Sequence, residues 1–143
     1  VHPMQIDERY VVIDAHSQDR PSDVAKVFLQ PGTLDRSGLP PGCRLMKVTT
    51  NDMAGYVKPG DMVVYNPGVK WISTGSDVYV FRVEDQLVLR RAARTLRGEI
   101  ILSNEHGESQ ESFRGEDFTS DVEHAPGLIF VVGMVVARVL LRA

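Results

Sequence analysis

Short apolar runs that each end in turn-forming residues are the feature of this sequence that most restricts its fold. The clearest run, Asp77 to Val83, has two alternating sets of residues: Tyr79, Phe81 and Val83 in one, and Val78, Val80 and Arg82 in the other. A period of two is typical of a β-strand with two distinct faces. The next run, Gln86 to Ala92, follows after only Glu84-Asp85, so we predict a hairpin.

Further strands are predicted where similar runs lie between turn residues, such as Pro59-Gly60 and Pro67-Gly68. They are Arg9 to Asp14, Arg44 to Thr49, Asp61 to Asn66, Glu99 to Ser103 and Leu128 to Leu141. One short helix is predicted after Ser22, which can cap it; its apolar face would hold Val24, Val27 and Phe28, and Pro31-Gly32 would end it. The predicted fold class is mostly β with one or two short helices.

The composition limits the classes of protein that fit. A chain of 143 residues suits one domain, and 43% hydrophobic residues are enough for a core. The net charge of −3 lacks the basic field that non-specific nucleic-acid binding needs. The longest apolar run, Leu128 to Ala137, is too short for a membrane-spanning helix, which needs about 20 residues. Cys43 is the single cysteine and favours a reducing compartment, so we expect a cytoplasmic protein.

Two segments carry uneven charge. The first is a cluster of arginines in a predicted strand and the turn after it: Arg90, Arg91, Arg94 and Arg97. Neighbouring side chains of a strand point to opposite faces, so we do not expect these arginines to form one phosphate site. The second, Glu105 to His124, holds seven acids and one arginine and predicts a solvated loop.

Histidines give little indication of a metal site. His106 and His124 could ligate a metal together with Glu105 or Glu123, but they have neither helical nor hairpin spacing. We therefore expect surface histidines, and no metal or cofactor. The sequence also lacks the common glycine-rich nucleotide-binding, zincin and serine-hydrolase signatures.

The most informative text is CRLMKVTTNDMAGYVKPGDMVVYNP, from Cys43 to Pro67. It predicts a strand, a tight polar segment at Thr50-Asn51-Asp52-Met53, a turn, and a second strand. This order resembles the C-terminal domain of LexA and phage repressors, the S24 peptidases, in which a strand leads to Gly-Asp-Ser-Met and Gly-Asp opens the next strand. YVFRVEDQLVLRR, IILSN and LIFVVGMVVARV follow in the same order as the family's hairpin, its next strand and its closing strand. The resemblance covers about a hundred residues, from Gly42 onward.

The resemblance implies a β-clip type domain of twisted antiparallel sheets, as in LexA and signal peptidases. It places residues 42–143 in the S24-like oligomerisation domain, with residues 1–41 as a preceding strand, short helix and connection. It also implies a helix-turn-helix domain upstream of Val1. We therefore expect the C-terminal part of a phage or prophage-type transcriptional repressor that forms a homodimer or larger assembly. Operator DNA would be bound through the upstream domain, and a protein anti-repressor is a further expected partner.

The catalytic positions of the family are altered here. The resemblance puts Asp52 where the nucleophilic serine stands and Arg90 where its lysine base stands, with Asn51, Met53 and Asp61 around the cleft. Arginine stays protonated at neutral pH and cannot act as a general base. We therefore expect an ion pair in place of the dyad, and a chain that does not cleave itself. The competing interpretation is an unrelated small β domain in which these two residues are ordinary.

Cleavage in the family also needs an Ala-Gly or Cys-Gly bond upstream of the domain. No such pair lies between Val1 and Pro41, and the one Ala-Gly, Ala54-Gly55, directly follows the altered nucleophile position. Two further functions stay open. One is a peptide- or ligand-sensing module that uses the degenerate cleft, and the other is an enzyme that pairs Asp52 with Asp61.

The interface between copies of the chain is predicted from the last strand, Leu128 to Leu141. Its alternation gives one small and apolar face and one mixed face, and a long apolar strand at a sheet edge can pair with its own copy. The expected interface residues are Gly133, Met134, Val135, Val136, Ala137, Arg138, Val139 and Leu140. The alternative is a strand paired on both sides within its own sheet.

Overall fold

Ten β-strands in one continuous sheet form the protein in the computed structural model, which describes residues 11–29, 39–107, 109–121 and 125–141. They are β1 (Val11–Ser17), β2 (Arg20–Leu29), β3 (Arg44–Lys47), β4 (Met62–Asn66), β5 (Asp77–Val83), β6 (Gln86–Arg94), β7 (Glu99–Ser103), β8 (Glu111–Arg114), β9 (Phe118–Thr119) and β10 (Ile129–Val139). The described residues contain no α-helix, only the 3₁₀ turn η1 (Gly115–Asp117). The predicted mostly-β class is confirmed.

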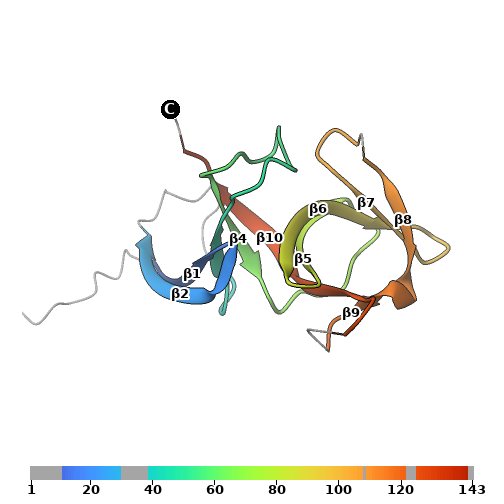
Figure 1. The fold of residues 1–143 in the computed structure, drawn as a ribbon, viewed down its shortest axis with the longest axis horizontal. Helices are drawn as coiled ribbons and strands as arrows, with labels where there is room; N and C mark the ends of the chain where they lie inside the picture. Colours follow the sequence, from blue (N-terminus) through green and yellow to red (C-terminus); the bar gives the residue numbers. More distant parts are fainter. Residues whose placement is uncertain (1–10, 30–38, 108, 122–124, 142–143) are drawn as a thin grey trace, which may run out of the picture.

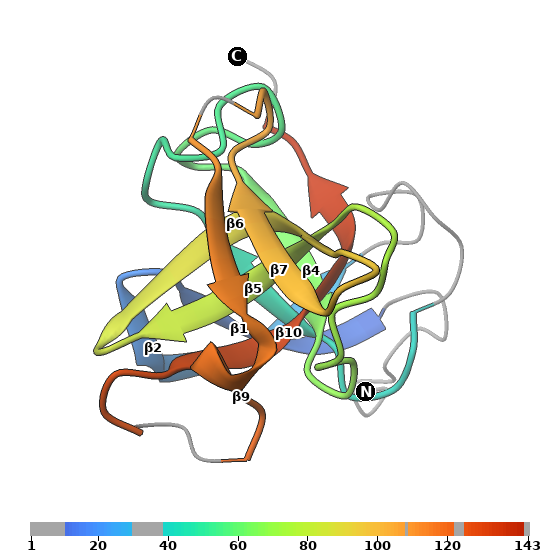
Figure 2. The same ribbon diagram turned by 90° about the vertical axis from the view of Figure 1, so that its right-hand side faces the viewer.

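The sheet runs in the order β2-β1-β3-β4-β10-β5-β6-β7-β8, with β9 added beside β10. All described strand pairs are antiparallel except β1 with β3 and β9 with β10, so the sheet is mixed. In Figure 1, β1 and β2 lie at one end of the molecule and β7 and β8 at the other, with β10 crossing between them. Figure 2 views the curled half formed by β5 to β9 from its outer side.

The predicted strands recur at or near their expected bounds, and β5 and β7 match them fully. The predicted hairpin is also present, since Val83 pairs with Gln86 across a turn in which Glu84 has a φ of 56°. The two faces of β5 are both buried, as its alternation requires. Tyr79 and Phe81 enter one hydrophobic cluster and Val78 and Val80 another. Arg9 and Tyr10, at the start of the first predicted strand, lie outside the described residues.

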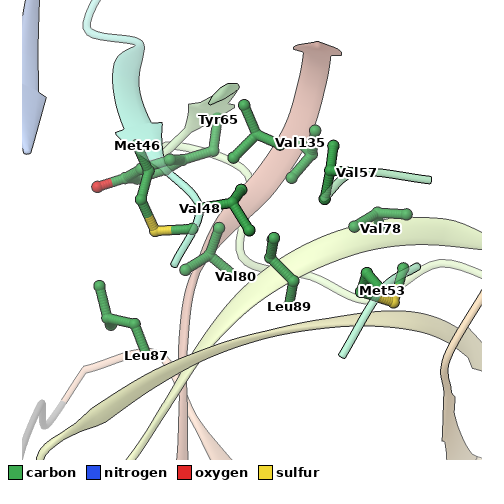
Figure 3. Close-up of a cluster of buried hydrophobic side chains, with 11 residues drawn as sticks. Met46, Val48, Met53, Val57, Tyr65, Val78, Val80, Leu87, Leu89 and Val135 are labelled. Carbon is green, nitrogen blue, oxygen red and sulfur yellow. The ribbon is translucent and has the colours of Figure 1, made fainter. Parts of the chain in front are cut away.

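Three hydrophobic clusters hold the sheet together. The central cluster, drawn in Figure 3, lies where the loop after β3 covers β4, β5, β6 and β10, and includes Met46, Met53, Tyr65 and Leu89. The second fills the curled half of the sheet, around Phe81. The third cluster lies beneath β1 and β3. Its buried residues are Ile13, Cys43, Leu45, Val64, Ala137 and Val139.

β10 is in the middle of the sheet, so the expectation of an edge strand is wrong. It pairs with β4 along Met134 to Val139 and with β5 along Ile129 to Met134. Its backbone therefore cannot pair with a second copy, and the interface predicted for Gly133 to Leu140 loses its basis. The predicted faces are nevertheless correct, because Val135, Ala137 and Val139 are buried and the intervening residues are half-buried.

The backbone of β10 comes so close to the end of β4 at Gly133 that only glycine fits at this position. A Cβ atom at Gly133 would lie 2.5 Å from the carbonyl oxygen of Asn66, at the end of β4. No side chain fits this gap, because the nearest atoms belong to rigid backbone. The pairing of β10 with β5 shifts register between Val131 and Gly133, so the same glycine also lies at an irregularity of the sheet.

The helix predicted after Ser22 is wrong, because these residues form β2. Val24, Val27 and Phe28 do have helical spacing, but a helix of two turns is marginal unless its apolar face is buried. Pairing with β1 satisfies the backbone instead and alternates the side chains. Val27 faces the third cluster, whereas Val24 and Phe28 are exposed.

The acidic segment is only partly a loop. It contains β8, η1 and β9, and Phe113 and Phe118 pack against the second cluster. Their ring centroids lie 5.8 Å apart, and Phe118 also contacts Phe81. The two aromatic residues order a segment that its charge predicts to be solvated. No helix in the described parts of the chain is long and apolar enough to cross a membrane.

His16 is a buried polar residue at the end of β1. Its Nδ1 lies 3.0 Å from the carbonyl oxygen of Ser17, and its Nε2 lies 2.7 Å from the hydroxyl of Tyr65. A carbonyl only accepts, so Nδ1 carries the proton and Nε2 accepts from the tyrosine. Burial lowers the pKa of His16, and Arg44 and Arg82 lower it further, while the bond to Ser17 opposes these effects.

We predict that His16 makes the protein less stable in weak acid. The unfolded histidine binds a proton near pH 6.5, whereas the folded one resists protonation until its lowered pKa is reached. Stability is therefore full above pH 6.5 and falls as the pH drops from 6.5 through the folded-state pKa. Urea unfolding at about pH 7.5 and about pH 5 measures the effect. His16→Gln, which keeps a donor and an acceptor, should lose less stability over this range; an equal loss in both proteins contradicts the prediction.

Candidate functional site

The segment between β3 and β4 builds the loop that carries Asp52. Residues 52–56 form tight turns, closed by bonds from the N–H groups of Tyr56 and Val57 to the carbonyl oxygen of Met53. Gly55 within this loop has a φ of +95°, and a Cβ atom there would lie 2.6 Å from Nε2 of His106. Ala54-Gly55 is thus a structural part of the loop, as its sequence position predicts.

The structure brings Asp52 and Arg90 together. Nη1 of Arg90, on β6, lies 3.5 Å from Oδ2 of Asp52 and 2.7 Å from the carbonyl oxygen of Leu89. The Asp52 side chain is 42% exposed and that of Arg90 is 28% exposed. This is a half-exposed ion pair at the two positions where the resemblance places the serine and the lysine.

The chemistry of this pair is electrostatic. A serine–lysine dyad needs a neutral amine that can take the serine proton, and the guanidinium of Arg90 is always charged. Asp52 is an anion in contact with that cation, so neither side chain offers the other a proton to transfer. The pair neutralises charge beside the loop and supplies no activated nucleophile.

Two other residues predicted around the cleft have different surroundings. Met53 is buried in the central cluster, so its assignment to the cleft is wrong. The side chain points inward because the loop has to cover β5 and β6, as Figure 3 shows. Asn51, in contrast, is exposed next to Asp52.

Asp61 is buried and binds the backbone, which leaves it no role in a pair with Asp52. Its Oδ2 accepts the N–H of Lys58 at 2.9 Å, and its Oδ1 accepts the N–H of Leu141 at 2.8 Å. The first bond closes the turn before β4, and the second fixes the residues after β10. Asp61 lines a pocket with Leu140 and Leu141, whereas Asp52 lines a different one.

Gln18, at the tip of the β1–β2 hairpin, is a buried residue of the site that the sequence did not indicate. Its Nε2 donates to the hydroxyl of Thr50 at 3.0 Å and to the carbonyl oxygen of Leu87 at 2.9 Å. Its Oε1 accepts the N–H of Thr49 at 3.0 Å. This side chain therefore fastens the hairpin to both the site loop and β6. A glutamine in a turn carries no periodic signal, so the pattern of residues could not identify it.

A pocket of about 320 Å³ lies between these elements. It is lined by residues of the hairpin tip, the site loop and the β5–β6 turn: Gln18, Asp19, Thr49, Thr50, Asp52, Asp85, Gln86, Leu87 and Val88. The pocket combines three carboxylates with a small apolar wall. Its size suits a peptide side chain or a short segment of a partner.

The arginines on and after β6 do not form a joint site. Arg91 binds Glu105 through Nε and Nη2, at 3.1 and 2.6 Å, on the opposite side of the strand from Arg90. Arg94 stacks on Trp71 with its Cζ 3.8 Å from the ring centroid. Within the described residues, no group of three or more histidine, cysteine and acidic residues could hold a metal; His124 lies outside them.

We predict that Asp61→Ala costs far more stability than Asp52→Ala. Removing Asp61 leaves two N–H groups without their acceptor, which costs about 2 kcal/mol or more. Removing Asp52 loses one half-exposed ion pair, which costs about 1 kcal/mol or less. Urea unfolding of the two variants beside the unchanged protein measures both effects. Equal losses would show that Asp52, and not only Asp61, holds the loop in place.

Comparison with known proteins leaves the family open. No protein-family model matches the chain, and no curated protein matches it.

Proposed function

We propose that this chain is the C-terminal oligomerisation domain of a phage or prophage-type transcriptional repressor that has lost self-cleavage. The resemblance to S24 peptidases supplies the family, and the mostly-β fold agrees with it. The contact between Asp52 and Arg90 is the observation that carries the proposal. These two residues are 38 positions apart in the sequence, and the resemblance assigns them to the two members of one catalytic dyad.

The domain strengthens DNA binding by raising the local concentration of the DNA-binding domains at the operator. Two copies held together present two upstream DNA-binding domains to two operator half-sites, so binding of the second becomes intramolecular. Operator affinity rises without a new base contact. The net charge of −3 fits a domain that does not itself bind DNA. We place the protein in the cytoplasm, since a sequence with Cys43 as its single cysteine forms no internal disulfide.

A second candidate function is docking of a protein anti-repressor in the pocket beside Asp52. The pocket of about 320 Å³ between the hairpin tip and the site loop favours this candidate. A segment with a basic side chain suits it, because Asp19 and Asp85 line the pocket with negative charge, while the charge of Asp52 is balanced by Arg90. Docking there would contact both the hairpin tip and the site loop, and it offers a route to induction without cleavage.

We predict that the protein forms a reversible dimer or larger assembly. Sedimentation velocity over a wide range of concentrations should show a weight-average mass that rises with concentration and then reaches a plateau. A strict monomer at the highest concentration would overturn the oligomerisation role and leave the pocket beside Asp52 as the functional site.

We also predict that the unchanged chain stays intact and that its dyad can be restored. Intact-mass measurement after long incubation at alkaline pH should give one species, because Arg90 stays protonated and cannot act as the general base of the site. The double variant Asp52→Ser/Arg90→Lys should then cleave a supplied Ala-Gly peptide, with the single variants as inactive controls. A product from the unchanged chain, or none from the double variant when it is folded, contradicts the proposed origin of the site.

A further inference from the structure

The connection between β4 and β5 carries an exposed tryptophan. Trp71 is 69% exposed, although the next residue, Ile72, is only 1% exposed. The guanidinium of Arg94, at the end of β6, lies over the Trp71 ring with its Cζ 3.8 Å from the ring centroid. Tryptophan is enriched at binding surfaces because its large ring supplies apolar contact area. This ring therefore offers such area to a ligand beside a fixed positive charge.

Arg94 is held in place by the backbone while part of its guanidinium stays available. Its Nε donates to the carbonyl oxygen of Ile72 at 2.8 Å, and its backbone N–H donates to the carbonyl oxygen of Ser73, also at 2.8 Å. Among the described residues, neither Nη1 nor Nη2 of Arg94 has a hydrogen-bond or ion-pair partner. A guanidinium held in one orientation loses little side-chain entropy when it binds an anion.

The charge of Arg94 also lacks a partner. The other two arginines of β6 each pair with an acid, Arg90 with Asp52 and Arg91 with Glu105. In the described part of the chain, no carboxylate forms an ion pair with Arg94. A negatively charged ligand would therefore meet an uncompensated cation here.

Lys70, next to Trp71 in the sequence, supplies a second positive charge. Its Nζ lies 4.6 Å from the centroid of the Phe130 ring and 3.4 Å from the carbonyl oxygen of Ser120. An ammonium group has three donors, and the contact with Ser120 uses one of them. The other two can donate to a ligand.

A pocket of about 110 Å³ joins these groups. Lys70 and Arg94 both line it, and its described lining contains no acidic residue. Nη1 of Arg94 lies near Gly115, another lining residue, since a Cβ atom at that glycine would be 3.4 Å from it. The apolar part of the wall is formed by Ile72, Ile100, Phe118 and Val131.

We propose that this pocket binds an organic carboxylate, held by Arg94 and Lys70, with its apolar body against Trp71. The proposal goes beyond the oligomerisation role and does not depend on it. Guanidinium and carboxylate are both planar, so Nη1 and Nη2 can each donate to one oxygen. A volume of about 110 Å³ holds about four water molecules, which suits a carboxylate group and leaves the rest of the ligand on the Trp71 ring.

A phosphate group fits this pocket less well. It carries more oxygens than a carboxylate, and each of them is a strong hydrogen-bond acceptor. Some of these oxygens would face the apolar wall around Ile100 and Val131, where they lack a donor.

The fluorescence of Trp71 tests the proposal, because Trp71 is the single tryptophan of the chain. Cyclohexanecarboxylate, titrated at constant ionic strength, should give a saturable change with a dissociation constant of about 1 mM, as expected for a ligand of about nine non-hydrogen atoms. Cyclohexanecarboxamide has the same shape without the charge and should bind at least tenfold more weakly. Equal binding of the two compounds, or no saturation by the acid up to about 50 mM, overturns the proposal.

Three variants with the same loss of charge locate the site. Arg94→Gln should weaken binding of cyclohexanecarboxylate at least tenfold and Lys70→Gln at least threefold. Arg97→Gln should leave it within about twofold, because Arg97 is exposed in the turn after β6 and does not line the pocket. Circular dichroism shows whether each variant folds, and Lys70→Gln, which changes a residue outside the strands, gives an answer even if Arg94→Gln does not fold. Equal weakening by all three variants overturns the site.

Two further probes identify the source and class of the anion. Tighter binding of the blocked peptide acetyl-Leu-Glu-Leu-amide than of cyclohexanecarboxylate supports the acidic side chain of a partner protein as the carboxylate. Tighter binding of the free acid supports a small organic acid. Inorganic phosphate should bind more weakly than both, and a phosphate that binds more tightly than either overturns the carboxylate.

Discussion

β10 is the strand on which the three hydrophobic clusters depend. Its first residues, Ile129 and Val131, lie in the second cluster, Val135 lies in the central one, and Ala137 and Val139 lie in the third. One strand can serve three clusters because it pairs with β5 along its first half and β4 along its second. The crossing between the two halves requires the missing side chain of Gly133, where the backbone of Asn66 comes close. The two ends of the sheet are therefore coupled through this position.

In the candidate site, the residues that fix the position of the loop differ from the residues that are exposed there. Gln18 and Asp61 are buried, and each makes hydrogen bonds to backbone groups distant in the sequence. Asp52 and Arg90 are half-exposed and make one long contact with each other. Loop position thus depends on the buried amide and carboxylate, while the exposed pair can change with little effect on the fold.

The sequence predicted best the features that depend on local alternation. β5, β7 and the hairpin after Val83 follow directly from a period of two and a short turn, and the alternating faces of β10 do as well. Alternation does not say which strands become neighbours, so the position of β10 in the sheet was predicted wrongly. A helix is predicted for the residues of β2 because Val24, Val27 and Phe28 have helical spacing, whereas pairing with β1 places Val27 on the buried face and leaves the other two exposed. At the site, ordered motifs brought Asp52 and Arg90 together, whereas Gln18 and the burial of Met53 depend on tertiary packing.

The central place of β10 has a consequence for how the chain folds during synthesis. Its partners β4 and β5 are made well before it, so both have an unpaired edge until the last strand leaves the ribosome. Those edges carry Val63, Val64 and Val80, which are fully buried in the finished protein. The half-made chain therefore exposes valine-rich strands for the time that about fifty residues take to be translated, which is a few seconds at about 5–20 residues per second. Chaperones that bind extended apolar segments would bind this chain mainly in that interval.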